Sequence, residues 1–371
     1  MSPLSSHNKS PLTSAEFTKD LIDPATRRHS DIGHLLSGVA SSHSEDVTQE
    51  FINTAQAPSY FQAYGNYSDL VNCAIIDVIY IATPRSHHFQ NAMLILEAGK
   101  HVLCEKRLTV NAAQAKKLFA IAKQKQCFLM EGLWIRFLLV SVEMRRLFQA
   151  GALRTVTHVF ADNGLGVDPY RDFATSDRMV SARVFNPLGY ASHTERKSSS
   201  NSDPLRYDEI PLSGVDETTT ILIKFAPSIA DGPEIQATAS ASLHTTTNTV
   251  GETAAVRSQD DQGEIQIFSW SWCPSRPRVI NRSPGMNSRG FISSDGTDLL
   301  PDGAYGLCFE SDEAARCICE GLLESSEMPW LESLIVMEFM DTVRWENDVQ
   351  FPEEIEILEY PVALLPKRSQ N

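Results

Sequence analysis

Residues 77–130 read DVIYIATPRSHHFQNAMLILEAGKHVLCEKRLTVNAAQAKKLFAIAKQKQCFLM. Three short apolar runs in this stretch, at residues 78–81, 101–104 and 127–130, have the length and composition of buried strands. Between these runs, the apolar residues recur at the spacing of a helix rather than a strand. The stretch therefore predicts a β-α-β-α-β unit with parallel strands and right-handed crossovers.

The two segments between the strands carry the apolar stripes of amphipathic helices. The first stripe consists of Phe89, Ala92, Met93 and Leu96. The second stripe consists of Ala115, Leu118, Phe119 and Ala122. Gly99 follows the first stripe and predicts the end of that helix, while Asn111 and Gln114 resemble a capping box at the start of the next.

Polar residues follow two of these strands. Thr83 and Pro84 come after the first strand, where proline stops the ladder, and Glu105 and Lys106 come at the end of the second. In such units, ligands bind at the carboxyl ends of the strands. We therefore expect the chemistry of the protein at these two strand ends.

The composition is that of an ordinary globular protein. The chain is 42% hydrophobic and 21% charged. Its length of 371 residues suggests two domains or one large domain with an insertion. The formal net charge of -15 at pH 7 argues against a nucleic-acid or anionic-membrane surface, although it leaves room for a local basic pocket that binds phosphate. No apolar run is long enough to span a membrane, and the first residues do not form a secretory signal.

Cysteine and histidine usage points to no metal site. The seven cysteines are scattered, and the closest pair, Cys317 and Cys319, lacks the spacing of a metal or redox motif. His87 and His88 have no carboxylate or cysteine at ligand spacing. We expect reduced thiols in a cytoplasmic protein.

Longer motifs resemble the glucose–fructose oxidoreductase, inositol dehydrogenase and MocA (Gfo/Idh/MocA) family, and within it the branch of dimeric dihydrodiol dehydrogenases and NADP-dependent D-xylose 1-dehydrogenases. The resemblance rests on T-P-R-S-H-H at residues 83–88 and on E-A-G-K-H-V-L-C-E-K at residues 97–106. Further similar pieces follow at residues 183–187, 216–220 and 324–330.

This resemblance implies reversible hydride transfer between a sugar or diol carbinol carbon and a nicotinamide. Lys106 takes the place of the family lysine, which orients the reacting hydroxyl and assists proton transfer with a neighbouring acid–base group. The remaining site residues divide into those expected at the cofactor and those expected at the substrate. The cofactor residues are Ser41, Ser42, Thr83, Pro84, His88, Glu105 and Lys106. The substrate residues are Trp134, Arg136 and Arg183.

Ser41 and Ser42 suit NADP better than NAD, because an acidic residue at this place would bind the ribose hydroxyls of NAD. Tyr190 is a candidate proton donor and, with Lys106, completes the expected catalytic residues. The substrate is expected to be a small sugar or diol, and the second domain of this family commonly builds a homodimer through its sheet.

The implied fold is an α/β Rossmann-like domain, lacking its first strand and glycine-rich turn, followed by an α+β domain with a mostly antiparallel open sheet. Alternating apolar residues at 221–225 and 237–243 support that sheet. The expected divisions are a disordered segment at 1–13, the NAD(P)-binding domain at 14–135, the α+β domain at 136–352 with a flexible insert near 191–206, and a tail at 353–371.

Three departures from the family pattern keep a second hypothesis open. No glycine-rich turn occurs before Ser14, the expected E-K-P reads Glu105-Lys106-Arg107, and Tyr190 follows Asn186-Pro187-Leu188-Gly189 without the usual helix. The leading hypothesis is an NADP-dependent dehydrogenase. The alternative is a catalytically impaired relative that senses a cofactor or binds a partner with the same fold.

Overall fold

The computed structural model describes residues 2–5, 11–27, 30–42, 44–153, 155–164, 206–209, 216–225, 234–242, 245–247, 253–261, 263–270, 273–281, 305–346 and 349–362. The chain forms two compact units. The first comprises Met1–Gly132, Leu300–Thr342 and Gln350–Asn371, and the second comprises Leu133–Leu299 and Val343–Val349.

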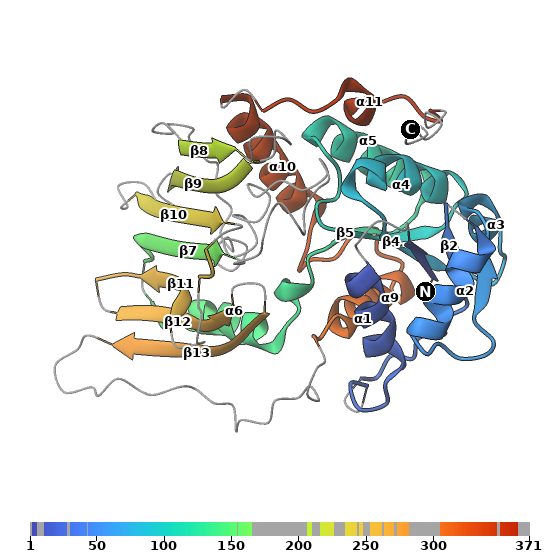
Figure 1. Cartoon of the computed structure of the whole chain (residues 1–371). Helices are drawn as coiled ribbons and strands as arrows, with labels where there is room; N and C mark the ends of the chain where they lie inside the picture. The colour runs from blue at the N-terminus through green and yellow to red at the C-terminus, as the bar shows by residue number, and fades with distance from the viewer. Residues whose placement is uncertain are drawn as a thin grey trace. The chain divides into compact units, whose positions relative to one another are not determined.

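A six-stranded sheet forms the centre of the first unit (Figure 1). Its strands, in chain order, are β1 (Ser2–Ser5), β2 (Gly38–Ser41), β3 (Gln62–Tyr64), β4 (Val78–Ala82), β5 (His101–Glu105) and β6 (Leu129–Gly132). All five neighbouring pairs are parallel, and the spatial order is β3-β2-β1-β4-β5-β6. This is the strand order of a doubly wound dinucleotide-binding fold, whose ligands bind at the carboxyl edge near the point where the order reverses. The expected Rossmann-like fold class is confirmed.

Strand β1 corrects the expectation that the first strand is missing. Ser2–Ser5 pairs with β2 on one side and β4 on the other, and helix α1 (Pro11–Ile22) begins before Ser14. The sequence Ser-Pro-Leu-Ser is too polar to predict a central strand, where proline is also disfavoured. Pairing with a strand on either side decides the conformation here, against the local propensity.

Helices cover the two faces of this sheet (Figure 1). They are α1, α2 (Glu45–Thr54), α3 (Tyr67–Val71), α4 (His88–Glu97), α5 (Ala112–Lys125) and α9 (Cys308–Cys319). On the face of α4 and α5, both predicted helical stripes are buried in one apolar cluster with Ile79, Ile81, Val102 and Cys104. On the other face, Phe17 of α1 stacks on Tyr80 of β4, with 3.7 Å between ring centroids.

The predicted helix ends are also confirmed. The Asn111 side chain caps α5 by accepting a hydrogen bond from the Gln114 amide (2.9 Å), and Gly99 after α4 has φ of +75°.

The second unit contains a seven-stranded, mostly antiparallel sheet in the order β13-β12-β11-β7-β10-β9-β8. Its strands are β7 (His158–Gly164), β8 (Arg206–Glu209), β9 (Asp216–Phe225), β10 (Ile235–Ser242), β11 (Ala254–Gln259), β12 (Gly263–Trp270) and β13 (Cys273–Asn281). Only the β7–β10 pair is parallel among these strand pairs of the described sheet. The alternation predicted for residues 237–241 is confirmed, since Ala237, Ala239 and Ala241 are buried and their neighbours are not. Helix α6 (Leu139–Gln149) also belongs to this unit.

The division of the chain differs from the expected one near its C-terminus. Residues 136–352 were expected to form one domain, but residues 300–342 return to the first unit. The reason is packing: α9 buries Cys308 and Ala314, and Asp20 of α1 accepts a hydrogen bond from the Leu307 amide (2.9 Å) at its start. Helix α10 (Trp330–Glu346) likewise buries Met337 in the core of the first unit, and the short helix α11 (Glu353–Glu356) follows it.

Candidate active site at the ends of β4 and β5

The ends of β4 and β5 lie next to each other at the carboxyl edge of the first sheet. The two strands pair in parallel, with Ile81 opposite Cys104, so the residues that follow each strand emerge side by side. Thr83 and Pro84 follow β4 and lead into a short 3₁₀ turn, Arg85–His87. Glu105 ends β5, and Lys106 comes directly after it. The sequence thus predicted correctly which two segments meet at this edge.

His88 connects the two segments. Its Nε2 lies 2.9 Å from the carbonyl oxygen of Thr83, and its Nδ1 lies 2.6 Å from that of Arg107. The ring is buried, and burial lowers the pKa of His88 despite these two carbonyl groups. The resemblance implied that His88 lines the cofactor. In the structure, its two ring nitrogens face carbonyl oxygens of Thr83 and Arg107, so the ring fixes the positions of the two segments.

The Thr83 side chain also contacts a neighbouring helix. It is buried, and its hydroxyl oxygen accepts a hydrogen bond from Asn91 Nδ2 on α4 (3.0 Å). The backbone after β4 is therefore held by two side chains of α4, His88 and Asn91. The Thr83 side chain contributes to this support, while Pro84 begins the turn above it.

Glu105 and Lys106 form the charged centre of this edge. Lys106 Nζ lies 3.5 Å from Glu105 Oε2, and the lysine side chain is 27% exposed. The other carboxylate oxygen of Glu105 accepts a hydrogen bond of 2.5 Å from the hydroxyl of Tyr80. Burial raises the pKa of Tyr80 well above its usual value, which keeps this phenol protonated and available as a donor. Lys106 is thus a partly exposed cation beside a buried carboxylate whose orientation is fixed.

Sequence reasoning missed Tyr80 and Glu310. Tyr80 lies within an apolar strand, where its hydroxyl is the one polar signal. Glu310 of α9 is fully buried, and burial, with the nearby charge of Glu105, raises its pKa well above the usual value. It lies more than 200 residues away from Glu105 in the sequence, so only the fold brings the two carboxyl groups together.

Buried residues hold the loop that follows Lys106. Arg107 is buried, and burial lowers its pKa to about 10, partly offset by the charge of Glu131. One carboxylate oxygen of Glu131 accepts a hydrogen bond from the Leu108 amide (3.2 Å), and the other accepts one from Ser333 (2.7 Å). The Lys106–Arg107 peptide bond is cis. Arg107, which stands where the family E-K-P pattern has proline, is therefore buried in a loop whose backbone is held by Glu131.

The end of β2 provides hydroxyl groups at the same edge. Ser41 is buried at the end of the strand, and Ser42 is exposed immediately after it. Burial raises the pKa of the neighbouring Tyr67, partly offset by its hydrogen bond to Ser42. Neither of these two positions carries a carboxylate, the side chain that binds the ribose hydroxyls of NAD.

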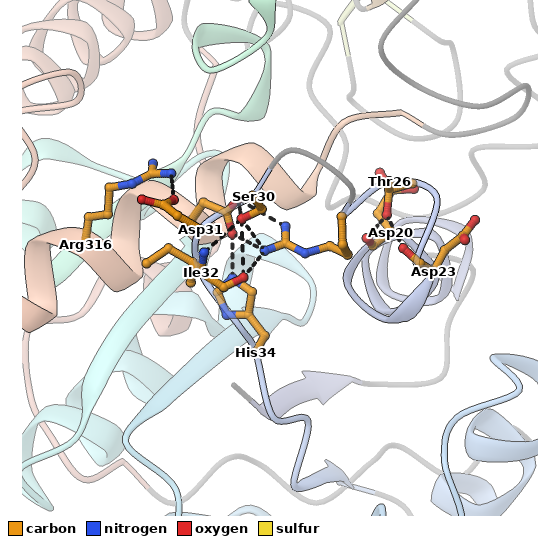
Figure 2. A network of polar contacts seen from close by, with 10 residues as sticks. Asp20, Asp23, Thr26, Ser30, Asp31, Ile32, His34 and Arg316 are labelled. Carbon is orange, nitrogen blue, oxygen red and sulfur yellow. Dashed lines mark hydrogen bonds and ion pairs between the residues drawn. The ribbon is translucent and has the colours of Figure 1, made fainter.

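A polar network ties the connection between α1 and β2 to α9 (Figure 2). The Asp312 carboxylate accepts hydrogen bonds from Arg27 (2.6 and 3.1 Å) and Ser30 (2.7 Å), and it lies 2.7 Å from His34 Nε2. Burial alone would raise the pKa of Asp312, but the contacts from His34, Arg27 and Ser30 outweigh it and lower the pKa below its usual value. The network fixes the position of α9, the helix that carries Glu310.

The residues expected at the substrate belong to the second unit. Trp134 and Arg136 lie in a short 3₁₀ turn, Trp134–Arg136, and both are buried. The Arg136 carbonyl accepts a hydrogen bond from Arg145 of α6 (2.7 Å). Arg183 and Tyr190 lie outside the described residues.

Neither a metal cluster nor a membrane span is found within the described ranges. Those residues contain no group of three or more His, Cys, Asp or Glu side chains that could hold a metal ion. None of the helices seen in them is long and apolar enough to cross a membrane.

Comparison with known proteins identifies the family. A family model described as "Oxidoreductase family, NAD-binding Rossmann fold" matches residues 16–133. The D-xylose 1-dehydrogenase (NADP(+)) of Hypocrea jecorina is 35% identical over 359 residues, covering 91% of this chain and 90% of that relative. The chain belongs to the Gfo/Idh/MocA oxidoreductase family.

Other Gfo/Idh/MocA relatives agree with this assignment. The trans-1,2-dihydrobenzene-1,2-diol dehydrogenase of Danio rerio is 28% identical over 322 residues, covering 82% of this chain and 87% of that relative. Among solved structures, the aldose-aldose oxidoreductase from Caulobacter crescentus has a TM-score of 0.69 at 17% identity, covering 94% of this chain and 98% of that one. At that identity, the likeness shows the fold alone.

Proposed function

We propose that this protein is an NADP-dependent oxidoreductase that transfers a hydride between a hydroxyl-bearing carbon of a sugar or trans-dihydrodiol and the nicotinamide. The observation that carries the proposal is the position of Lys106, beside the fixed Glu105 at the carboxyl edge of a sheet with the dinucleotide-binding strand order. Two relatives named as an NADP(+)-dependent D-xylose 1-dehydrogenase and a trans-dihydrodiol dehydrogenase support the substrate class.

The residues present fit NADP at this edge. The strand order reverses between β1 and β4, where a dinucleotide binds in such sheets. Ser41 and Ser42 at the end of β2 offer hydroxyl groups. Neither position carries a carboxylate, which would repel the phosphate on the adenosine ribose. When bound, NADP supplies the carbon that accepts the hydride.

Lys106 orients the substrate hydroxyl and stabilises negative charge on its oxygen as the proton leaves. Glu105 holds the Lys106 ammonium group in place, and the Tyr80 hydroxyl holds Glu105. His88 keeps the Thr83–Pro84 segment and the Lys106 loop in register, because it contacts a carbonyl from each. The site therefore depends on a rigid support beneath one partly exposed cation.

The proposed function also involves substrate residues in the second unit, a proton donor and a homodimer. Trp134, Arg136 and Arg183 shape the substrate side, and Tyr190 donates and accepts the proton of the reacting hydroxyl. The protein acts in the cytoplasm as a homodimer through its second sheet. Exposed Phe160 (38%) and Leu222 (47%) on that sheet support a partner surface there.

The test is the reduction of NADP by the purified protein with D-xylose, other aldoses and trans-dihydrodiols, followed spectrophotometrically. Lys106→Ala is the matched inactive control, because it removes the proposed cation while leaving the buried support intact. Reduction by the wild-type protein and its loss in Lys106→Ala are expected. If no substrate supports reduction, the dehydrogenase proposal is wrong.

One observation favours a second candidate. Residues 6–10 read Ser-His-Asn-Lys-Ser and contain no glycine, although a glycine-rich turn normally lets the backbone approach the pyrophosphate between β1 and α1. A protein that binds NADP without turnover would be a cofactor sensor. Isothermal titration with NADP separates the candidates: binding without reduction supports the sensor, and absence of both leaves an interaction protein of the same fold.

A further inference from the structure

Glu310 is a buried carboxyl group that the proposed reaction has not yet used. Its side chain is completely buried, and no described residue forms a hydrogen bond with either of its carboxyl oxygens. A carboxylate in such surroundings would lose its hydration without any compensating donor. The group is therefore stable only as the neutral acid.

The charged groups that act on Glu310 belong to the active edge. Besides burial, the charge of Glu105 at the end of β5 raises the pKa of Glu310, and the charge of Lys106 lowers it. Besides burial, Glu310 contributes to the raised pKa of Tyr80 of β4. On its own helix, Cys308 and Asp312 are each two residues from Glu310 in the sequence, and Asp20 of α1 accepts a hydrogen bond from the Leu307 amide at the start of that helix. Glu310 thus faces the lysine and carboxylate that we assign to the reaction.

The two carboxyl groups are not equivalent. Glu105 accepts a hydrogen bond from Tyr80 and lies 3.5 Å from the Lys106 ammonium. Neither carboxyl oxygen of Glu310 accepts a hydrogen bond from a described residue. Two neighbouring carboxyls in a dry site cannot both ionise without mutual repulsion. Glu105 is the member of the pair that contacts Lys106, and Glu310, which has no hydrogen-bond donor among the described residues, is the neutral member.

We propose that Glu310 is a positioning residue for the reaction at Lys106: a neutral acid that acts through Glu105 and keeps a single negative charge facing the lysine. This inference rests on the proposed dehydrogenase function. A second negative charge behind Lys106 would hold the ammonium proton more tightly and hinder its exchange with the neighbouring acid–base group. Ionisation of Glu310 at high pH would therefore lower activity.

The first test measures the charge state without turnover. Infrared difference spectra of the cofactor-free protein at neutral pH compare the wild type with Glu310→Gln, which preserves the size of the side chain but cannot ionise. We expect the wild type to show the carbonyl stretch of a protonated carboxylic acid, and Glu310→Gln to lack it. Asp31→Asn, which removes an exposed carboxylate paired with Arg316 of the same helix, is the matched control and should retain the band. If Glu310→Gln leaves the acid band unchanged, Glu310 is ionised and the inference is wrong.

The second test is the pH profile of kcat/KM for NADP reduction. Glu310→Gln cannot ionise, so it should lack the decline at high pH that ionisation of Glu310 causes, and the wild type should lose up to roughly tenfold more activity than the variant for each pH unit above the midpoint of that decline. Asp31→Asn, whose carboxylate is 77% exposed, should keep the wild-type profile. A merely structural role for Glu310 would lower kcat/KM by the same factor at every pH, and that result would overturn the inference.

A further variant covers the case in which Glu310→Gln does not fold. Tyr80→Phe keeps the ring on Phe17 but removes the donor to Glu105, so the proton should redistribute between the two carboxyls and shift the acid band. An unchanged band in Tyr80→Phe would contradict the shared charge. If the wild type reduces no substrate, the proposed function fails and the role of Glu310 in it fails as well. If the wild type is active and the profile of Glu310→Gln keeps its shape, only the role of Glu310 fails.

Discussion

The network around Asp312 gives the sharpest test of how α9 is held. Replacing Asp312 with Asn removes the negative charge that Arg27, Ser30 and His34 contact. The side chains of Asp312 and Arg27 are only 5% and 14% exposed, so water cannot replace the lost partner of the guanidinium. The substitution therefore leaves a nearly buried cation without its counter-charge.

The magnitude follows from that burial. Removing one partner of a buried ion pair typically costs about 3–5 kcal/mol, because the remaining charge keeps its desolvation penalty. We expect Asp312→Asn to lower the free energy of unfolding by that amount. Replacing both partners, as Arg27→Met with Asp312→Leu, removes both charges and should cost less than Asp312→Asn alone.

The measurement is urea denaturation of the full chain, followed by circular dichroism. The matched control is Asp31→Asn, which breaks the pair between Asp31 and Arg316 (2.8 Å) on the same helix and loop. Because Asp31 is 77% exposed, solvent and salt screen this pair, and its loss should hardly change stability. Equal effects of Asp312→Asn and Asp31→Asn would refute the reasoning from burial.

The effect of Asp312 should also depend on pH in a defined direction. Its pKa is lowered in the folded protein, so its contribution is complete above the pKa of an unfolded aspartate, about 4. The contribution is lost as the pH falls through the lower folded value. The stability difference between the wild type and Asp312→Asn should therefore shrink below about pH 4. A difference that stays constant into that range would contradict the assigned charge.

Three further substitutions test the active edge. Lys106→Ala should lower kcat/KM by roughly 10²–10⁴-fold with little change in thermal midpoint, since the side chain is partly exposed; retained activity would exclude it as the key cation. His88→Leu leaves the Thr83 and Arg107 carbonyls without their partner. It should cost about 1–3 kcal/mol in urea denaturation, and an unchanged midpoint would contradict the bridging role. Ser42→Asp should weaken NADP binding at least about tenfold relative to NAD binding in titrations, because the new carboxylate repels the ribose phosphate. Equal losses of NADP and NAD affinity would contradict a position of residue 42 beside that phosphate.

The sequence predicted those parts of the fold that depend on local pattern. The apolar stripe of residues 89–96 and the cap at Asn111 lie as expected, because periodicity and capping are properties of neighbouring residues. The segments at Thr83 and Lys106 could be paired in advance, because parallel strands present their carboxyl ends at one edge.

Other features depend on contacts between distant segments and could not be predicted in this way. Strand β1 forms from a polar segment because it pairs on both sides. The contacts of His88 with carbonyls on two different loops are of this kind. Glu310 reaches the active edge only because α9 returns to the first unit after the second sheet.

The most direct test of the central claim is the fate of the hydride itself. The protein is incubated with NADP and D-xylose deuterated at its anomeric carbon, and the cofactor is analysed by mass spectrometry. We expect deuterium on the nicotinamide ring of the NADPH formed, and none with Lys106→Ala. If the wild-type protein yields no deuterated cofactor from D-xylose or from the corresponding deuterated trans-dihydrodiol, it is not a dehydrogenase of these substrates.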